Sequence, residues 1–385
     1  MPTISAPRVV AEGRVLQPGT VVVEGERVAA VLEGPVPSST SDVHLEQGVL
    51  APGLIDLQLN GMVGVDFGSA PAEDWQRVQK ALPSTGVTAF LPTLITAPLD
   101  SLAGGLEIAA AARAATVGQP VARILGVHLE GPFLSAQRRG AHDPAWLLDP
   151  TPERIDQLLE ADGDILALVT LAPELEGGLE AIRRLSERGV VVSIGHSDAT
   201  AEQTTAAVEA GARMVTHLFN AQRGLHHREP GVVGQALVEP RLILGLIVDL
   251  SHVVASVCKL VFAAAPGRVA LVTDATAAAG QPPGRYELGG EIIEVGPTGP
   301  PRRLDGTLAG AVLRLDEAVA NAVGLGFDLA LAIDAASRIP ADVLGRGDLG
   351  RLAPGAVADL VWLGDDLHTR AAWIGGKLAF GEVDW

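Results

Sequence analysis

Eight short apolar segments alternate with longer stretches of helical pattern over residues 51 to 275. Two of these stretches, residues 71–86 and 177–189, are typical of amphipathic helices that end at glycine. An alternation of strand and helix indicates βα units around a parallel sheet. Eight units predict an α/β fold of the TIM-type (β/α)8 barrel class, with a doubly wound open sheet as the alternative. The eight strand candidates are residues 54–60, 87–93, 123–131, 165–173, 190–196, 213–219, 242–249 and 269–275.

Both ends of the chain carry short strand candidates separated by glycine-containing turns, without a helical period. These candidates occupy residues 8–53 and 353–383. Because the same texture flanks the barrel segment on both sides, we predict that the two termini build one small β-sandwich domain. The predicted boundaries are 1–50 for its N-terminal part, 51–351 for the barrel and 352–385 for its C-terminal part.

A segment rich in glycine and proline, residues 281–311, interrupts the alternation after the eighth strand candidate. We expect it to form an excursion or hairpin over the mouth of the barrel. Two helices are predicted after it, in residues 313–324 and 328–345.

Composition narrows the classes of function. Hydrophobic residues make up 48% of the chain and charged residues 19%, which is typical of a compact globular protein. The formal net charge of −18 argues against binding to nucleic acid or to an anionic membrane. The single Cys258 excludes an intrachain disulfide and fits a reducing compartment. Neither a leader nor an apolar stretch long enough to span a bilayer is apparent, so the expected location is cytoplasmic.

Polar side chains gather at the C-terminal ends of the strand candidates. A buried polar group without a partner costs roughly 1 to 3 kcal/mol, so six strands that end in this way by accident are improbable. In TIM-type barrels the catalytic groups lie at this end of the strands. The sequence therefore predicts an active site built from the strand ends. The residues concerned are Gln58, Asn60, Glu130, His196, His217, Asp249, His252 and Asp274.

Glu130, His196 and His217 come from three different strand candidates. Together they offer one carboxylate oxygen and two imidazole nitrogens, a ligand set that suits zinc, with iron or another divalent ion as alternatives. A purely structural role, with each side chain hydrogen-bonded near the rim, is the competing interpretation. His128 lies two residues before Glu130 on the same strand face, and we expect it to support the site by packing or hydrogen bonding.

Asp274 ends an otherwise apolar strand candidate. A metal-activated water needs a neighbouring base, and a carboxylate in a dry pocket can take its proton and return it to a leaving group. Capping or structural metal binding is the alternative role for Asp274.

Arg228 and His252 are the most natural anion binders near the predicted rim. The planar guanidinium of arginine matches the oxygens of a phosphate, although a solvated surface position would explain Arg228 equally. Adjacent side chains point apart in most conformations, so we do not expect His226 and His227 to bind a metal.

The order of the motifs resembles that of the N-acetylglucosamine-6-phosphate deacetylases of the amidohydrolase superfamily. The resemblance covers most of the chain, and it is specific only when the motifs are taken together. In order they are "APGLIDLQLNG", "HLEGPFLSAQRRGAH", "IGHSDAT", "THLFNA", "REPG", "LVTDATAAAG", "GTLAGA" and "GRLAPGAVADLVWL".

The resemblance implies a role for each matching position. Glu130, His196 and His217 are expected to bind one divalent metal, and Asp274 to act as general base and acid. The 6-phosphate would be held by Arg228 and His252, close to the interface of a homodimer. The implied reaction is hydrolysis of N-acetyl-D-glucosamine 6-phosphate to D-glucosamine 6-phosphate and acetate. Contacts to the sugar and the amide are implied for Ala141, His142, Asn220, Ala221, Leu308, Ala309 and Gly310.

Two positions depart from wider patterns. Many amidohydrolases have His-x-His on the first strand, where this chain has Gln58 and Asn60, as one branch of the deacetylases does. Neutral amides are poor zinc ligands, so we expect the second metal site to be absent or weak and the amides to contact water or substrate. Leu250 replaces an expected glycine two residues before His252, which affects the shape around the phosphate.

Two other functions compete with this interpretation. One is an amidohydrolase that acts on a different amide, such as a dihydroorotase-like or aminoacylase-like enzyme. It would need a two-metal site, and neither His-x-His nor a lysine at a strand end is present in the barrel segment. The other is a catalytically inactive barrel that serves as a binding protein. The joint presence of Glu130, His196, His217 and Asp274 argues against it.

Overall fold

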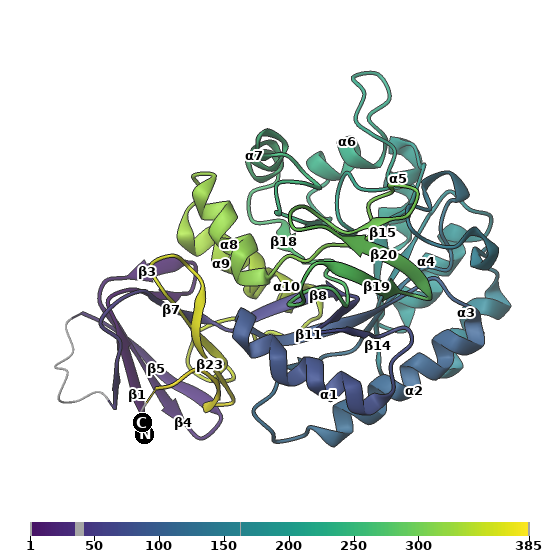
Figure 1. Ribbon diagram of the computed structural model, residues 1–385. Coiled ribbons are helices and arrows are strands. Elements are labelled where there is room, and N and C mark those ends of the chain that lie inside the picture. Colours follow the sequence, from purple (N-terminus) through teal and green to yellow (C-terminus); the bar gives the residue numbers. More distant parts are fainter. Residues whose placement is uncertain (1, 35–41, 162, 384–385) are drawn as a thin grey trace.

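A computed structural model of the chain describes residues 2–34, 42–161 and 163–383, and its centre is a closed parallel barrel (Figure 1). Each strand pairs in parallel with the next, and the short β12 (Arg123–Ile124) precedes the third strand. The ring closes where Leu59 bridges Ala275. The TIM-type barrel is therefore confirmed. Its strands are β8 (Leu54–Leu59), β11 (Val87–Ile95), β13 (Val127–Glu130), β14 (Leu166–Leu171), β15 (Val191–Ile194), β16 (Met214–Val215), β17 (Ile243–Leu246) and β18 (Val269–Leu271).

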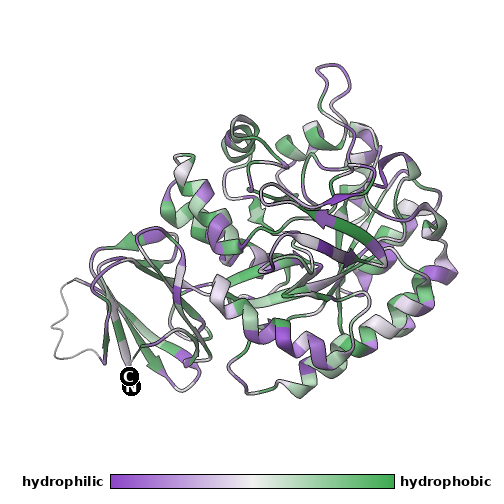
Figure 2. Ribbon diagram, in the orientation of Figure 1, coloured by the Kyte–Doolittle hydropathy of each residue, from purple (hydrophilic) through white to green (hydrophobic). Residues whose placement is uncertain are grey.

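Helices cover the outside of the barrel and turn their apolar faces inward (Figure 2). In α4, for example, Ala181, Ile182 and Leu185 are buried at helical spacing, while the opposite face is charged. The capping box of Thr200 and Gln203 fixes the start of α5. The helices are α1 (Ala72–Ala81), α2 (Leu99–Ala115), α3 (Pro152–Ala161), α4 (Gly178–Glu187), α5 (Ala201–Ala210), α6 (Gly231–Val238), α7 (Ala255–Ala264), α8 (Leu315–Gly324), α9 (Leu329–Ala336) and α10 (Arg338–Val343).

The predicted continuous helix over residues 328–345 is wrong in one respect, because it breaks at Ser337 into α9 and α10. Pro340 lacks the N–H that would donate to the carbonyl of Ala336, so the helical ladder cannot run through. The Ser337 hydroxyl instead donates to the carbonyl of Ile333 at 2.6 Å. Over the described residues, no helix has both the length and the apolar content that a membrane crossing requires. The cytoplasmic location stays a prediction.

Strands from the two ends of the chain form two sheets beside the barrel. The sheets share one core, in which Ile4 and Val28 of the first face Leu360 and Trp373 of the second. A β-sandwich built from both termini is thus confirmed, whereas the exact boundaries at residues 50 and 351 stay a prediction. One sheet has the order β5 (Arg27–Glu33), β4 (Gly19–Glu24), β1 (Thr3–Ala6), β6 (Val43–His44), and the other β24 (Lys377–Phe380), β23 (Thr369–Ile374), β22 (Leu360–Leu363), β7 (Val49–Pro52), β2 (Val9–Ala11), β3 (Arg14–Leu16).

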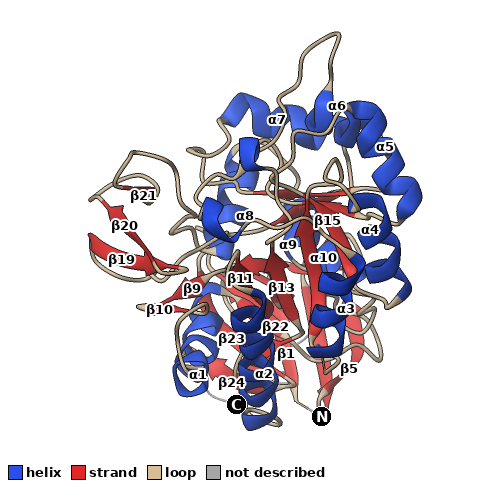
Figure 3. Cartoon of the chain, turned by 90° about the vertical axis from the view of Figure 1, so that its right-hand side faces the viewer, coloured by secondary structure: helices blue, strands red, loops and turns tan. Residues whose placement is uncertain are grey.

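The glycine- and proline-rich segment forms a small antiparallel sheet at the barrel mouth (Figure 3). Its strands are β19 (Gly284–Leu288), β20 (Glu291–Val295) and β21 (Arg302–Arg303). The carboxylate of Asp66, on the hairpin of β9 (Gly61–Met62) and β10 (Val65–Asp66), accepts a hydrogen bond from the backbone N–H of Gly289 at 3.2 Å. Arg303 donates to the carbonyl of Ala141 at 2.8 Å. These bonds attach the sheet to the loops that surround the strand ends.

Candidate active site

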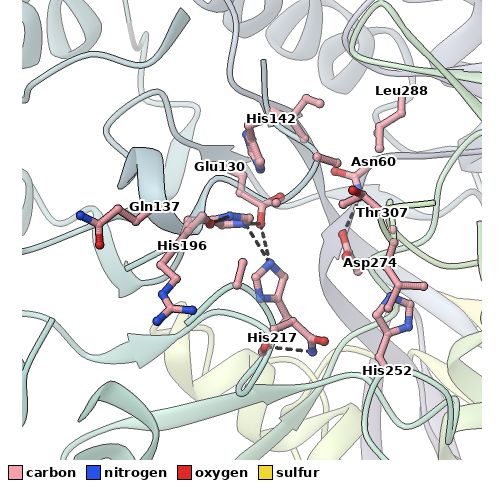
Figure 4. A pocket seen from close by; sticks show the side chains of 18 residues that line it. Asn60, Glu130, Gln137, His142, His196, His217, His252, Asp274, Leu288 and Thr307 are labelled. Carbon is pink, nitrogen blue, oxygen red and sulfur yellow. Dashed lines mark hydrogen bonds and ion pairs between the residues drawn. The ribbon is translucent and has the colours of Figure 1, made fainter. Parts of the chain in front are cut away.

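A cavity of about 350 Å³ opens at the C-terminal ends of the barrel strands, beneath the β19–β21 sheet (Figure 4). Side chains from the strand ends and from the loops that follow them converge on this cavity. It is lined by Asn60, Ile95, Glu130, Gln137, Arg138, Gly140, Ala141, His142, His196, His217, Asn220, Ala221, His252, Asp274, Leu288, Thr307, Leu308 and Gly310.

Most of the predicted site residues therefore lie together, and four do not line the cavity, among them Asp249, which is bonded to the lining residue His252. Gln58 is buried behind the lining, where it contacts two of the lining carboxylates. Ala309 is also buried behind the lining and packs in a small cluster with Leu288 and Ile293. Arg228 lies away from the cavity, exposed on the loop before α6 that projects from the molecule (Figures 1 and 3).

Three of the predicted ligand atoms converge on one point. Oε1 of Glu130 lies 2.9 Å from Nε2 of His217 and 3.1 Å from Nε2 of His196. The two imidazole nitrogens are 3.2 Å apart. Burial by itself would raise the pKa of Glu130, but its interactions with the two histidines hold it well below its ordinary value. The carboxylate is therefore ionised and available as a ligand.

The proton positions of His196 indicate that a cation fits at this point. Nδ1 of His196 donates to the carbonyl of Arg138 at 2.9 Å, so the neutral ring presents a lone pair at Nε2. That lone pair faces a carboxylate oxygen and a second imidazole, both of which are metal ligands. A histidine that donates one nitrogen to a carbonyl and directs the other toward a metal is the usual arrangement in metal sites. The donor set therefore fits one divalent cation.

His142 is a third histidine close to this point, and the ligand atoms of Glu130, His142 and His196 lie within 4.8 Å of one another. Its protonation argues for a different role. The backbone N–H of Thr96 donates to Nδ1 of His142 at 3.3 Å, and the Thr96 hydroxyl lies 2.7 Å from the same nitrogen. Burial lowers the pKa of His142 to about 3, so the ring is neutral and its proton is on Nε2. A protonated Nε2 donates a hydrogen bond and does not bind a metal.

Asp274 lies at the end of β18 with two amides beside it. Nδ2 of Asn60 donates to Oδ1 of Asp274 at 2.7 Å, and Nε2 of Gln58 lies 3.2 Å from the same oxygen. Burial, and then the negative charge of Glu130, raise the pKa of Asp274 to about 6. A carboxyl group with this pKa can accept and release a proton near neutral pH.

Three of these residues have strained backbones. His196, His217 and Asp274 have φ values of 47°, 27° and 52°, in the left-handed region that costs most residues free energy. Strain of this kind persists only where the surrounding structure fixes it, and it is concentrated at functional sites. At Gly310, an added Cβ would lie 2.9 Å from the carbonyl oxygen of Asp274 and 2.5 Å from Cγ2 of Thr276. Glycine thus allows this loop to approach the end of β18 closely.

A layer of hydrogen-bonded side chains lies below the cavity, inside the barrel. Nε2 of His128 is 2.8 Å from Oγ1 of Thr170, which is 2.6 Å from Oγ1 of Thr216. Asp56 accepts from the hydroxyl of Thr273 at 2.6 Å. Burial raises the pKa of Asp56 to about 7, although the hydrogen bonds from Thr273 oppose this shift. His128 and Asp56 therefore support the site from below and do not enter it.

Several residues of the site were not predicted from the sequence. Arg138 stands within the motif "HLEGPFLSAQRRGAH", between Glu130 and His142, and this position indicates that it lies near the site. Thr96 follows the end of β11, so the rule that picked out other strand ends applies to it. Leu288 reaches the cavity only because the β19–β21 sheet folds over it, and the sequence around it carried no such signal.

Comparison with known proteins agrees with this geometry. The profile of the amidohydrolase family matches residues 49–380. The N-acetylgalactosamine-6-phosphate deacetylase of Escherichia coli O157:H7 is 41% identical over 354 residues, which cover 91% of this chain and 92% of that protein. The N-acetylglucosamine-6-phosphate deacetylase of Danio rerio is 39% identical, over 87% of this chain and 85% of that protein.

A solved structure extends the similarity to the whole fold. A variant of N-acetyl-D-glucosamine-6-phosphate deacetylase from Mycobacterium smegmatis, in complex with N-acetyl-D-glucosamine-6-phosphate, is 35% identical and superposes with a TM-score of 0.92. The alignment covers 98% of this chain and 99% of that one. The chain therefore belongs to the amidohydrolase family, and the resemblance to its N-acetylglucosamine-6-phosphate deacetylases is confirmed.

Proposed function

We propose that the protein hydrolyses the acetamido group of N-acetyl-D-glucosamine 6-phosphate to D-glucosamine 6-phosphate and acetate. The observation that carries this proposal is the convergence of Glu130, His196 and His217 on one point, with Asp274 beside them in the same cavity. The names of the relatives supply the substrate class.

We infer that Glu130, His196 and His217 hold one divalent ion and that this ion is zinc. One carboxylate oxygen with two imidazole nitrogens is a common zinc ligand set that leaves a position open. Bound there, the ion would supply Lewis acidity toward the amide carbonyl and would lower the pKa of a water molecule. Gln58 and Asn60 are bonded to carboxylates as hydrogen-bond donors, which supports a single-metal site.

Proton transfer is the role proposed for Asp274. In its ionised form Asp274 takes a proton from the attacking water, and the water oxygen forms a bond with the carbonyl carbon of the amide. Asp274 then gives this proton to the amine nitrogen as the C–N bond breaks, because an unprotonated amine anion is a very poor leaving group. Nε2–H of His142 would donate a hydrogen bond to the carbonyl oxygen as negative charge develops on it.

Asn60 carries a free acceptor that fits the substrate. Asn60 lines the cavity, and its Oδ1 is buried and has no hydrogen-bond partner over the described residues. A buried acceptor without a partner costs roughly 1 to 3 kcal/mol, and a donor on the substrate would relieve this cost. We assign further sugar and amide contacts to the predicted segments, namely Ala141, Asn220, Ala221 and the loop from Leu308 through Ala309 to Gly310.

The 6-phosphate is assigned to His252 and Arg228. His252 lines the cavity, whereas Arg228 is exposed on the projecting loop, too far to line the cavity of its own chain. We infer that the protein is a homodimer in which the loop brings Arg228 to the cavity of the partner. Exposed apolar residues in the loop before α6 and at the start of α7 support this interface: 50% of Leu225 and 54% of Val254 are exposed.

The name of one relative suggests a second candidate substrate. The E. coli O157:H7 protein is named for N-acetylgalactosamine 6-phosphate, the epimer that differs at the C4 hydroxyl. Hydrolysis of this epimer by the same residues is the second candidate function. Nothing in the catalytic groups distinguishes the two sugars, because the C4 hydroxyl is remote from the amide.

Acetate release from the two epimers, each with and without the phosphate, tests both functions with the zinc-loaded protein. We expect the highest kcat/KM for one of the phosphorylated sugars, and the better epimer identifies the substrate. Asp274→Asn should bind the sugar yet lose turnover by a factor of about 1,000 or more, since it removes the base. Turnover by Asp274→Asn at the wild-type rate would refute the mechanism. Activity on an unrelated amide alone would instead favour a different amidohydrolase.

A further inference from the structure

Asp249 and His252 form a tightly bonded pair at the C-terminal end of β17. Oδ2 of Asp249 lies 2.7 Å from Nδ1 of His252. Oδ1 of the same carboxylate accepts from the backbone N–H groups of His252 at 2.8 Å and Ser251 at 2.9 Å. Only 4% of the His252 side chain and 13% of the Asp249 side chain are exposed. The ring of His252 therefore has one fixed orientation.

The position of one ring proton follows from these bonds. Burial by itself would raise the pKa of Asp249, but hydrogen bonds from His252 and Ser251 hold it below its ordinary value, so the carboxylate is ionised. An ionised carboxylate only accepts hydrogen bonds, and Nδ1 of His252 must therefore carry a proton. Nε2 is then the ring nitrogen that remains for the cavity that His252 lines.

The turn that carries the pair is held in a costly conformation. Leu250 has a φ of 62°, in the left-handed region, which is unfavourable for a residue with a Cβ. The two backbone hydrogen bonds to Asp249 span this residue and stabilise the turn. Asn321 of α8 anchors the preceding residue, because its amide donates to the carbonyl of Val248 at 2.9 Å.

We propose that Asp249 is a positioning residue for phosphate binding, which acts by orienting the ring of His252 so that it can donate to Asp249 and to the phosphate at once. The inference rests on the proposed role of His252 as a contact of the 6-phosphate. With Nδ1 protonated, a neutral ring would direct a lone pair from Nε2 at the phosphate. Only the imidazolium donates from both nitrogens, to the carboxylate at 2.7 Å and to a phosphate oxygen.

The negative charge of Asp249 also has an effect that opposes its effect through His252, because it repels a phosphate. Asp249 and Asp274 are both negatively charged groups that act on His252. An additional negative charge close to a phosphate repels it, so a carboxylate here favours binding only if it acts through the imidazole. The two possibilities predict opposite changes when the charge of Asp249 is removed.

Phosphate binding measures this difference without catalysis. Binding of inorganic phosphate and of glucosamine 6-phosphate to the zinc-loaded protein is measured by calorimetry for wild type, Asp249→Asn, His252→Asn and the double variant. We expect each single variant to bind about tenfold more weakly, the effect of one lost charge-assisted hydrogen bond. The double variant should bind no more weakly than His252→Asn, because Asp249 acts through His252. Ser251→Ala, in the same turn, should bind as wild type does.

Each contrary result has a distinct meaning. Tighter binding by Asp249→Asn, or additive losses in the double variant, would refute the positioning role. An unchanged affinity in His252→Asn would instead refute the proposed phosphate contact itself. Nitrogen-15 NMR of the histidines in wild type gives a test that needs no variant: Nδ1 of His252 should be protonated in the free protein and both nitrogens in the phosphate complex. A ring with Nδ1 unprotonated would overturn the proposal.

Discussion

Asn60 donates a 2.7 Å hydrogen bond from Nδ2 to Oδ1 of Asp274. Gln58 approaches the same oxygen at 3.2 Å and also donates to Oε1 of Glu130 at 3.1 Å. One oxygen of Asp274 is therefore engaged by two amides, which leaves Oδ2 as the oxygen that is free to exchange a proton. Gln58 links the proposed base to a proposed metal ligand, so the two carboxylates keep a fixed separation.

Replacement of Asn60 tests whether its hydrogen bond positions Asp274. Asn60→Leu keeps the approximate size of the side chain but removes the strongest hydrogen bond to Asp274. We expect kcat to fall by a factor of about 10 to 100, since a misplaced catalytic group loses rate steeply. The zinc content, measured by mass spectrometry, should stay at the wild-type level. A variant with wild-type kcat would show that the bond does not position the base.

Thr96 is expected to set the protonation of His142. Thr96→Val removes the hydroxyl that lies 2.7 Å from Nδ1 while it leaves the backbone N–H in place. We predict a fall in kcat of about tenfold with little change in KM, because the donor to the developing oxyanion is less well oriented. Thr96→Ser, which restores the hydroxyl, is the matched control and should recover most of the rate. Equal losses in both variants would indicate a packing effect instead.

Metal analysis should separate His142 from the three proposed ligands. We expect one zinc ion per chain, and we expect a chelator to abolish activity that added zinc restores. Glu130→Gln and His217→Gln should lose most of the bound ion. His142→Gln should keep the ion but lose activity, because Nε2 of His142 carries a proton and cannot be a ligand. Loss of zinc from His142→Gln would show that this ring belongs to the ligand set.

Asp56 should make stability depend on pH. Its pKa is about 7 in the fold against 3.8 as the ordinary value, so folding disfavours the charged form. The wild type should therefore lose stability as the pH rises from about 4 to about 7, by at most a few kcal/mol. Asp56→Asn cannot ionise at this position. Its unfolding midpoint minus that of the wild type should therefore be a few degrees larger at pH 8 than at pH 5. An equal difference at both pH values, with zinc present throughout, would contradict this.

Mixing of two impaired variants tests whether the cavity is completed by a partner. Arg228→Ala should raise KM for the phosphorylated sugar by about tenfold, because it removes a phosphate contact. Asp274→Asn should have almost no turnover. In a mixed dimer, the chain with an intact Asp274 receives Arg228 from the other chain, so kcat/KM should recover after subunit exchange. No recovery, despite mixed dimers seen by native mass spectrometry, would place Arg228 outside the site.

The barrel and its site could be anticipated because their signals are local. Each strand is a short apolar run, and Glu130, His196, His217 and Asp274 stand at the ends of such runs. A parallel barrel brings all its strand ends to one rim, so position in the sequence translated directly into position in space. The β-sandwich could be predicted for a similar reason, because the short strands between glycine-containing turns are local patterns at both termini.

Features that depend on contacts between residues far apart in the sequence could not be predicted. Leu288 lines the cavity because the β19–β21 sheet is attached at Asp66, over 200 residues earlier. The distinction between His142 as a donor and His217 as a ligand depends on the hydrogen bonds that each ring makes. Amino-acid type cannot supply this distinction, because both residues are buried histidines close to Glu130.

The chain passes from the sandwich to the barrel across one residue. β7 pairs with β22, β8 pairs with β11, and Gly53 alone separates them. An added Cβ at Gly53 would lie 2.2 Å from Oγ1 of Thr88, and its N–H donates to the carbonyl of Asp359 at 2.9 Å. The strand that carries the two active-site amides is thus a rigid extension of a sandwich strand. The sandwich thus supports the strand that carries Gln58 and Asn60. A substitution in the sandwich that shifts β7 is therefore expected to lower catalytic activity before it lowers the free energy of unfolding.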